Sequence, residues 1–153
     1  MRELAEVLLR GESSLTSAER ETIAAFVSSR NDCHFCQASH AAAAAHHDGG
    51  SYELVDAVTR DYRVAPVSSK LKALLAVAAS VQQGGKKVTS DQIIEAKAAG
   101  ATDVEIHDTI LIAAAFCMFN RYVDGLAMLT PIDPQMYDIM GQRMARDGYA
   151  RRV

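Results

Sequence analysis

The stretch "TDVEIHDTILIAAAFCMFNRYVD", residues 102–124, decides the fold of this chain. Thr102 and Glu105 have the spacing of a capping box, in which the two side chains satisfy backbone N–H groups at a helix start. The run at 110–119 is apolar on every side, yet it has only about half of the roughly 20 residues that a membrane-spanning helix needs. We therefore expect a long helix that is either central to the fold or buried in an oligomer interface.

The rest of the chain reads as a succession of further helices. Glycines and prolines separate apolar residues at helical spacing, and no stretch has the alternation or the β-branched residues of a strand. Abundant alanine favours close approach of helix axes. The sequence predicts one all-α domain over residues 1–153, a compact, Ala-rich bundle of six to eight helices. The expected helical segments are 2–10, 18–29, 33–48, 51–62, 70–83, 91–99, 103–124 and 135–146.

The composition excludes some classes of function. With 153 residues, 49% of them hydrophobic, the chain is long enough to bury a sizeable core. A net charge of -3 without a basic face makes nucleic acid an unlikely partner, and no segment suits a membrane. An odd number of cysteines, three, argues against a disulfide framework and is typical of a reducing compartment. We expect a cytoplasmic protein whose thiols are catalytic, metal-binding or merely buried.

The stretch "NDCHFCQASHAAAAAHHDGG", residues 31–50, places two cysteines three residues apart. If Asn31 or Asp32 caps a helix here, positions 33, 36 and 40 lie within about 60° of one another at 100° per residue. Both sulfurs and the His40 imidazole then share one face. Unpaired N–H groups and the helix dipole favour an anion at this end, so we expect a thiolate with a lowered pKa and His40 as its proton acceptor.

Two chemistries fit such a group of residues. One is peroxide reduction, in which one thiolate becomes a sulfenic acid and the second thiol condenses with it to a disulfide. The other is zinc binding by Cys33, Cys36 and His40, with Glu21 or His46 as the fourth ligand. Zinc sites usually combine two separated ligand pairs, and the sequence has no second pair at such spacing. The redox interpretation is therefore preferred.

Glu21 stands twelve residues before Cys33, and Cys36 and His40 complete a Glu, C-x-x-C-x-x-x-H pattern. The pattern resembles the peroxidase-type members of the alkyl hydroperoxidase D-like (AhpD-like) and carboxymuconolactone decarboxylase family. The segment 88–127, with its Phe-Asn-Arg and Asp-Gly run, is similar to the second half of the peroxidase-related subgroup. The resemblance spans about residues 15–127.

The resemblance implies an antioxidant, thiol-dependent hydroperoxide reductase with an all-α fold. It implies a homo-oligomer, commonly a trimer or hexamer, that needs no cofactor and is regenerated by a dithiol electron donor such as a lipoyl-bearing protein. Glu21 and His40 would manage protons, Cys36 would attack the peroxide and Cys33 would resolve it. Helix geometry alone leaves the order of the cysteines open, because the earlier cysteine of such a motif is often the more acidic one.

The chain departs from the family pattern at one position. Founding hydroperoxidases have a second histidine immediately before the later cysteine, whereas this chain has Phe35 there and His34 one place earlier. Successive helical residues point about 100° apart, so His34 does not inherit the role. We expect an incomplete proton relay. A decarboxylase-type or lactone-type enzyme on the same fold is a further alternative, although members with that chemistry lack the cysteine pair.

Other residues have simpler explanations. Cys117 lies within the apolar run and is expected to be a buried, inert thiol. His46 and His47 suit the C-terminal end of their helix, where the dipole favours cations. For the polar residues Asn120, Arg121 and Asp124, we prefer a local ion pair that orders the helix end or an interface over contact with a substrate.

Overall fold

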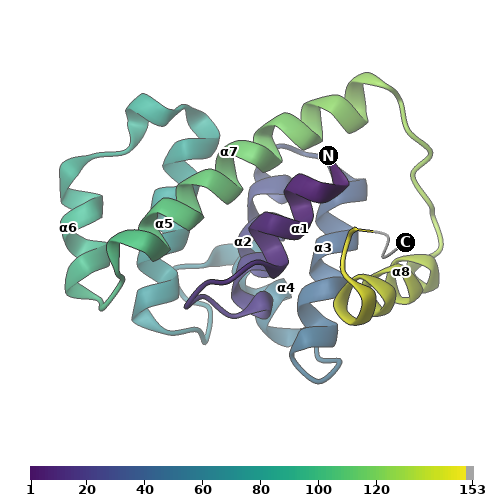
Figure 1. The fold of residues 1–153 in the computed structure, drawn as a ribbon, viewed down its shortest axis with the longest axis horizontal. Helices are drawn as coiled ribbons and strands as arrows, with labels where there is room; N and C mark the ends of the chain where they lie inside the picture. The colour runs from purple at the N-terminus through teal and green to yellow at the C-terminus, as the bar shows by residue number, and fades with distance from the viewer. Residues whose placement is uncertain (151–153) are drawn as a thin grey trace.

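The computed structural model describes residues 1–150, and these form eight α-helices and one short 3₁₀ helix without a strand (Figure 1). The all-α prediction and the predicted number of helices are therefore confirmed. Most predicted boundaries agree with the observed ones within about two residues. The elements are α1 (Arg2–Arg10), α2 (Ser17–Arg30), α3 (His34–His47), α4 (Glu53–Asp61), α5 (Ser69–Gln83), η1 (Gly85–Lys87), α6 (Ser90–Ala98), α7 (Asp103–Gly125) and α8 (Pro134–Asp147).

Helix starts are set by local side-chain caps. The capping box at Thr102 forms as expected at the start of α7, and two more begin α2 at Thr16 and α6 at Thr89. The start of α3 differs from the expectation. Its N-cap is Cys33, whose side chain makes no capping hydrogen bond, while Asp32 has a left-handed backbone with φ of 57°. The chain thus turns sharply between α2 and α3, and neither Asn31 nor Asp32 is the N-cap of α3.

Helix α2 is at the centre of the molecule. It packs against α1, α3, α4, α5 and α7, and every residue in 20–28 is buried. Among these buried residues are Arg20, Glu21, Thr22 and Ser28, which is unusual because polar side chains are mostly exposed. Arg20 donates to the backbone oxygens of Leu8 and Gly11, 3.2 and 2.9 Å away, and so fixes the end of α1. The centre of the fold is therefore partly polar.

The alanine run of α3 allows two helices to approach it closely. Residues 41–45 are all buried, and α3 packs against α2 and α8. A Cβ atom added to Gly141 of α8 would lie 2.4 Å from the Cβ of Ala42. The C-terminal helix thus rests directly on the small side chains of α3, as Figure 1 shows for the two helices on the right.

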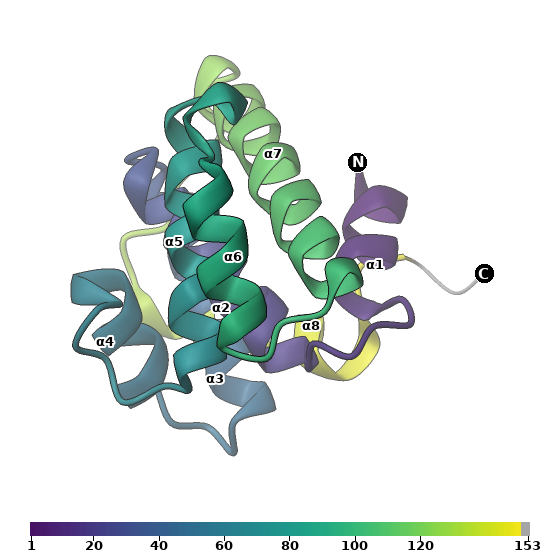
Figure 2. The ribbon, with the colours of Figure 1, turned by 90° about the vertical axis from the view of Figure 1, so that its left-hand side faces the viewer.

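Helix α7 is buried along one face only. Figure 2 shows it beside α5 and α6, and its inner residues such as Ile112 and Phe116 belong to the core. Its outer face is apolar as well, with Met118 and Tyr122 each 51% exposed. The run at 110–119 is therefore only half buried in a single chain. No helix within residues 1–150 is both long enough and apolar enough to cross a membrane.

Candidate active site

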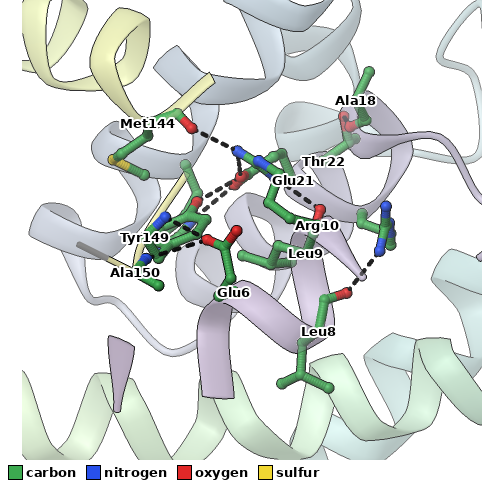
Figure 3. Close-up of polar contacts among 12 residues, drawn as sticks. Glu6, Leu8, Leu9, Arg10, Ala18, Glu21, Thr22, Met144, Tyr149 and Ala150 are labelled. Carbon is green, nitrogen blue, oxygen red and sulfur yellow. Dashed lines mark hydrogen bonds and ion pairs between the residues drawn. The ribbon is translucent and has the colours of Figure 1, made fainter. Parts of the chain in front are cut away.

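The Glu21 side chain is the centre of a buried polar cluster. Its exposed fraction is zero, and three side chains from three other parts of the chain reach it. Figure 3 shows two of them, Arg10 and Tyr149. Oε1 accepts from the Arg10 guanidinium at 2.6 Å and from the Tyr149 hydroxyl at 2.5 Å. Oε2 lies 2.7 Å from Nδ1 of His40. The predicted Glu21–His40 pair, on α2 and α3, is thus in direct contact.

These neighbours keep Glu21 ionised. Burial by itself raises the pKa of a carboxyl group, but the charge and hydrogen bond of His40, the charge of Arg10 and the Tyr149 hydrogen bond outweigh it. The pKa of Glu21 therefore lies below its ordinary value. Arg10 is held from other directions too, because it donates to the backbone oxygens of Leu9 at 2.8 Å and Met144 at 3.1 Å.

His40 is fixed in position by two aromatic rings and by Glu21. Its ring meets the edge of Phe116 at 4.6 Å between centroids and stacks on Tyr149 at 5.8 Å. Because an ionised Glu21 can only accept hydrogen bonds, Nδ1 of His40 carries the hydrogen in their contact. Nε2 is then the ring atom that can take up another proton.

Cys33 and Cys36 form a second, sulfur-containing cluster with Val123 and Phe35. They are 1% and 5% exposed. Burial and, to a smaller extent, a hydrogen bond to Asp124 raise the pKa of Cys33 to about 12, although a hydrogen bond with the Cys36 backbone acts to lower it. Burial also raises the pKa of Cys36. The expected lowering of the thiol pKa at the helix start is therefore wrong: desolvation and a nearby carboxylate outweigh the helix dipole.

Cys36 has the more favourable surroundings for a thiolate. Hydrogen bonds from Cys33 and from Asn120 act to lower its pKa, against the effects of burial and of the Asp124 charge. Asn120 is itself buried and rigidly held. Its amide nitrogen donates to Ser28 at 3.0 Å, and its oxygen accepts from Asn31 at 2.8 Å. Residues of α2, α3 and α7 thus converge on the sulfurs.

The expected local ion pair at the end of α7 is not found in residues 1–150. The Arg121 guanidinium donates to the backbone oxygen of Cys117 in its own helix, at 2.8 Å. Asp124 instead accepts a hydrogen bond from Cys33. The reason is the rotation of α7, which turns Asn120 toward Ser28 and Asn31, and Val123 toward the two cysteines. Cys117 is partly buried against the core and accepts a long contact from Asn31, at 3.5 Å.

A groove of about 930 Å³ leads to the histidine side of the site. His40 and Tyr149 line it together with Phe35, Ser39 and Met140. Phe35 stands at the position of the family histidine. Its ring and that of His34, one place earlier, both pack against the ring of Tyr137, at centroid distances of 6.3 and 5.7 Å. The position of the family histidine is thus filled by aromatic packing.

The sequence matches the model of the carboxymuconolactone decarboxylase family over residues 1–66 and 53–131. The chain belongs to this family. No curated relative matches it.

Two solved structures are similar to this chain. An uncharacterized peroxidase-related protein from Silicibacter sp. TM1040 has 29% sequence identity and a TM-score of 0.79, over 89% of this chain and 69% of that one. The alkylhydroperoxidase AhpD core of an uncharacterized peroxidase-related protein from Ralstonia eutropha JMP134 shares the fold, with 24% identity and a TM-score of 0.80, over 92% and 72% of the two chains. The predicted membership of the carboxymuconolactone decarboxylase family is confirmed, and the predicted AhpD-like fold is confirmed as well.

The surroundings of the candidate zinc ligands do not favour a zinc site. Both oxygens of Glu21 are engaged by Arg10, Tyr149 and His40, and His46 lies 2.9 Å from Asp138 on α8. Neither proposed fourth ligand therefore faces the sulfurs. Within residues 1–150, no three His, Cys, Asp or Glu side chains are placed to hold a metal ion. Burial lowers the pKa of His47, which disfavours the cation expected at this helix end.

Sequence reasoning missed three members of this site. Arg10 was part of a short amphipathic helix, and nothing in its neighbourhood indicates a partner on α2. Tyr149 follows the last predicted helix and belongs to no motif. The i+3 spacing of Asp124 from Arg121 favours a pair within α7 and gives no sign of its contact with Cys33. A buried polar stretch on α2 at 20–22 was the one signal available, and only the fold shows that it is buried.

Proposed function

We propose that this family member is a cytoplasmic thiol peroxidase that reduces hydrogen peroxide or small organic hydroperoxides through Cys33 and Cys36. The observation that carries the proposal is the 2.7 Å contact between Glu21 and His40. Because of this contact, His40, which lies on the helix that carries the Cys pair, has its hydrogen held on Nδ1. The odd number of cysteines, three, is typical of a reducing compartment.

The reaction divides into two balanced steps. The Cys36 thiolate attacks one oxygen of the O–O bond, giving a sulfenic acid on Cys36 and releasing an alcohol, or water from hydrogen peroxide. Nε2 of His40 is the atom proposed to take up the thiol proton and return it to the leaving oxygen. The Cys33 thiol then displaces water from the sulfenic acid and forms the disulfide. An external dithiol, such as a lipoyl group, reduces it and becomes a disulfide itself.

The surroundings of the sulfurs support this order and a small substrate. Hydrogen bonds that lower the pKa reach Cys36 from both Cys33 and Asn120, whereas Cys33 gives a hydrogen bond to Asp124, which raises its pKa. A thiolate therefore forms more readily on Cys36. With exposures of 1% and 5%, the two sulfurs admit compact hydroperoxides more easily than bulky ones.

The test measures peroxide consumption with dihydrolipoamide as the reductant. Cys36→Ser and Cys33→Ser should lose turnover, because each removes one of the two thiols that must form the disulfide. Cys117→Ser is the matched control, since Cys117 is the third thiol and has no part in the proposed reaction. It should retain the wild-type rate.

Thiol counting gives an independent readout. Mild peroxide should remove two of the three titratable thiols of the wild type. In Cys36→Ser, the two remaining thiols should not form a disulfide with each other. Equal turnover in wild type and Cys36→Ser would contradict the proposal. Turnover of a lactone substrate that survives complete thiol alkylation would favour the decarboxylase-type chemistry instead.

We also propose that the protein assembles with copies of itself, as a trimer or hexamer, through an α7–α8 apolar surface. This surface consists of exposed apolar side chains on the outer end of α7, the following segment and the start of α8. Leu129 and Ile132 are 86% and 98% exposed, which is costly for large aliphatic side chains in water. Its members are Met118, Tyr122, Leu126, Met128, Leu129, Ile132, Met136 and Ile139.

The assembly is tested by light scattering coupled to size-exclusion chromatography. A Leu129→Asp and Ile132→Asp double variant should shift the wild-type oligomer to the monomer mass, because it places two charges in the interface. Ile94→Asp on α6, where the side chain is 63% exposed, is the control and should leave the mass unchanged. A double variant with the wild-type mass, or a monomeric wild type, would refute the proposed interface.

A further inference from the structure

The C-terminal segment after α8 is held in a specific turn. Gly148 has φ of +72°, and a Cβ added there would lie 2.5 Å from a carboxylate oxygen of Glu6 on α1. That carboxylate accepts the backbone N–H groups of Tyr149 at 2.6 Å and Ala150 at 3.2 Å. Glycine is thus needed for both its conformation and its lack of a side chain. Figure 3 shows the Glu6 carboxylate beside Tyr149 and Ala150.

The turn places the Tyr149 side chain in the buried polar cluster around Glu21. Its ring lies between two members of the site, with the Arg10 guanidinium 5.1 Å from its centroid and the His40 ring stacked at an interplanar angle of 19°. Its hydroxyl is 2.5 Å from Oε1 of Glu21 and 3.2 Å from Nδ1 of His40. One side chain from the end of the described chain therefore touches both members of the proposed proton relay.

We propose that Tyr149 is a positioning residue for the Glu21–His40 pair, an inference that rests on the proposed peroxidase function. Its hydroxyl donates to Oε1 of Glu21 and leaves Oε2 to accept the Nδ1 hydrogen of His40. Its ring stacks on the His40 imidazole and fixes the orientation of that ring. Together these contacts keep His40 in the tautomer whose free Nε2 accepts the thiol proton.

The direction of the hydrogen bonds is fixed by charge. Glu21, kept as a carboxylate, can only accept. Burial, together with the adjacent Glu21 charge, raises the pKa of the Tyr149 hydroxyl well above its ordinary value, so the phenol keeps its hydrogen and donates. Tyr149, Arg10 and His40 are then three donors on one carboxylate. Each donor takes up part of its charge, and removing one leaves more of that charge for the other two.

The experiment replaces Tyr149 by Phe, which keeps the ring and removes only the hydroxyl. The readout is the titration and tautomer of His40 by ¹⁵N NMR, assigned by comparison with His40→Asn. With one donor fewer, Glu21 should hold the His40 imidazolium more strongly. We expect the titration midpoint to rise by about half to one pH unit, the equivalent of one net hydrogen bond. The acidic limb of the peroxidase pH profile should move in the same direction by the same amount.

Tyr52→Phe is the matched control, because the Tyr52 hydroxyl also donates to a carboxylate, that of Asp138, at 2.9 Å. It should leave the His40 titration unchanged. Glu6→Ala removes the anchor of the turn without touching the relay, so it should move the His40 midpoint in the same direction as Tyr149→Phe. This second variant separates the effect of placing the tyrosine from that of its hydroxyl.

The two proposals fail in different ways. A His40 midpoint and tautomer in Tyr149→Phe that match the wild type would overturn the positioning role, even in an active peroxidase. If the wild type reduces no hydroperoxide but Tyr149→Phe shifts His40, the positioning of the pair stands and the peroxidase proposal fails. The NMR measurement needs no substrate, so it decides the role of Tyr149 in either case.

Discussion

The substitution Glu21→Gln tests the buried cluster most directly. It preserves the volume of the side chain but removes the negative charge that faces Arg10 and His40. The side chain of Arg10 is only 12% exposed, so its charge would remain buried without a counter-ion. Breaking a buried ion pair in this way costs about 3–5 kcal/mol in unfolding free energy.

The lower part of that range applies here. Arg10 keeps two hydrogen bonds, to the backbone oxygens of Leu9 and Met144, which continue to solvate its charge. We expect Glu21→Gln to lose about 3 kcal/mol of stability at pH 7. For a chain of this length, that corresponds to a fall of roughly 6–12 °C in melting temperature.

The loss should depend on pH in a defined direction. The pKa of Glu21 is lowered in the folded protein, so its contribution is fully present above the unfolded value of about 4.3. It disappears as the pH falls through the lower folded value, because the protonated carboxyl then resembles glutamine. The difference between wild type and Glu21→Gln should therefore shrink below about pH 4.

Urea unfolding at pH 7, 5 and 3.5, at one protein concentration, measures both effects. Glu95→Gln on α6, an exposed glutamate without an ion pair in the described part of the chain, is the control and should stay within about 0.5 kcal/mol of the wild type. A loss below about 1 kcal/mol at pH 7 would show that Glu21 does not stabilise Arg10 as argued. A loss that stays constant down to pH 3.5 would contradict the linkage to its ionisation.

Three further outcomes follow from the thiol pair and the helix packing. In a Cys117→Ser background, iodoacetamide labelling of the two remaining thiols should still accelerate with pH above 9, because burial raises both pKa values; a plateau near pH 7 would disprove this. Asp124→Asn should speed labelling at pH 7.5 several-fold by removing the charge that raises those pKa values, and an unchanged rate would exclude that role. Gly141→Ala should cost about 1–3 kcal/mol, since its Cβ meets that of Ala42 at 2.4 Å. Gly125→Ala, with nothing within 4 Å, should cost less; equal melting temperatures for the two variants would refute the close packing of α8 on α3.

The secondary structure could be predicted because its signals are local. The Thr102–Glu105 box acts within one helical turn, and Gly84 and Gly100 end their helices through their own backbone conformations. Such interactions are present in any fold that the segment adopts. The Cys33 cap was mispredicted because a tertiary reversal between α2 and α3, with Asp32 at positive φ, sets that boundary.

The candidate site was predicted only in part. The Glu21, Cys33, Cys36 and His40 spacing indicated the pair that meets at 2.7 Å, and their catalytic roles stay predictions. The direction of the thiol pKa shift was wrong. A helix start favours a thiolate when it faces water, but the packing of α3 against its neighbours removes that water from the sulfurs.

The sequence by itself determined the helices and the residues that carry the chemistry, because capping, periodicity and side-chain type act over a few residues. Only the tertiary structure decided their electrostatics. Arg10 and Tyr149 come from near opposite ends of the described chain, yet both donate to Glu21. Charge and desolvation act through space, and no local pattern shows which distant groups the fold brings within hydrogen-bonding distance.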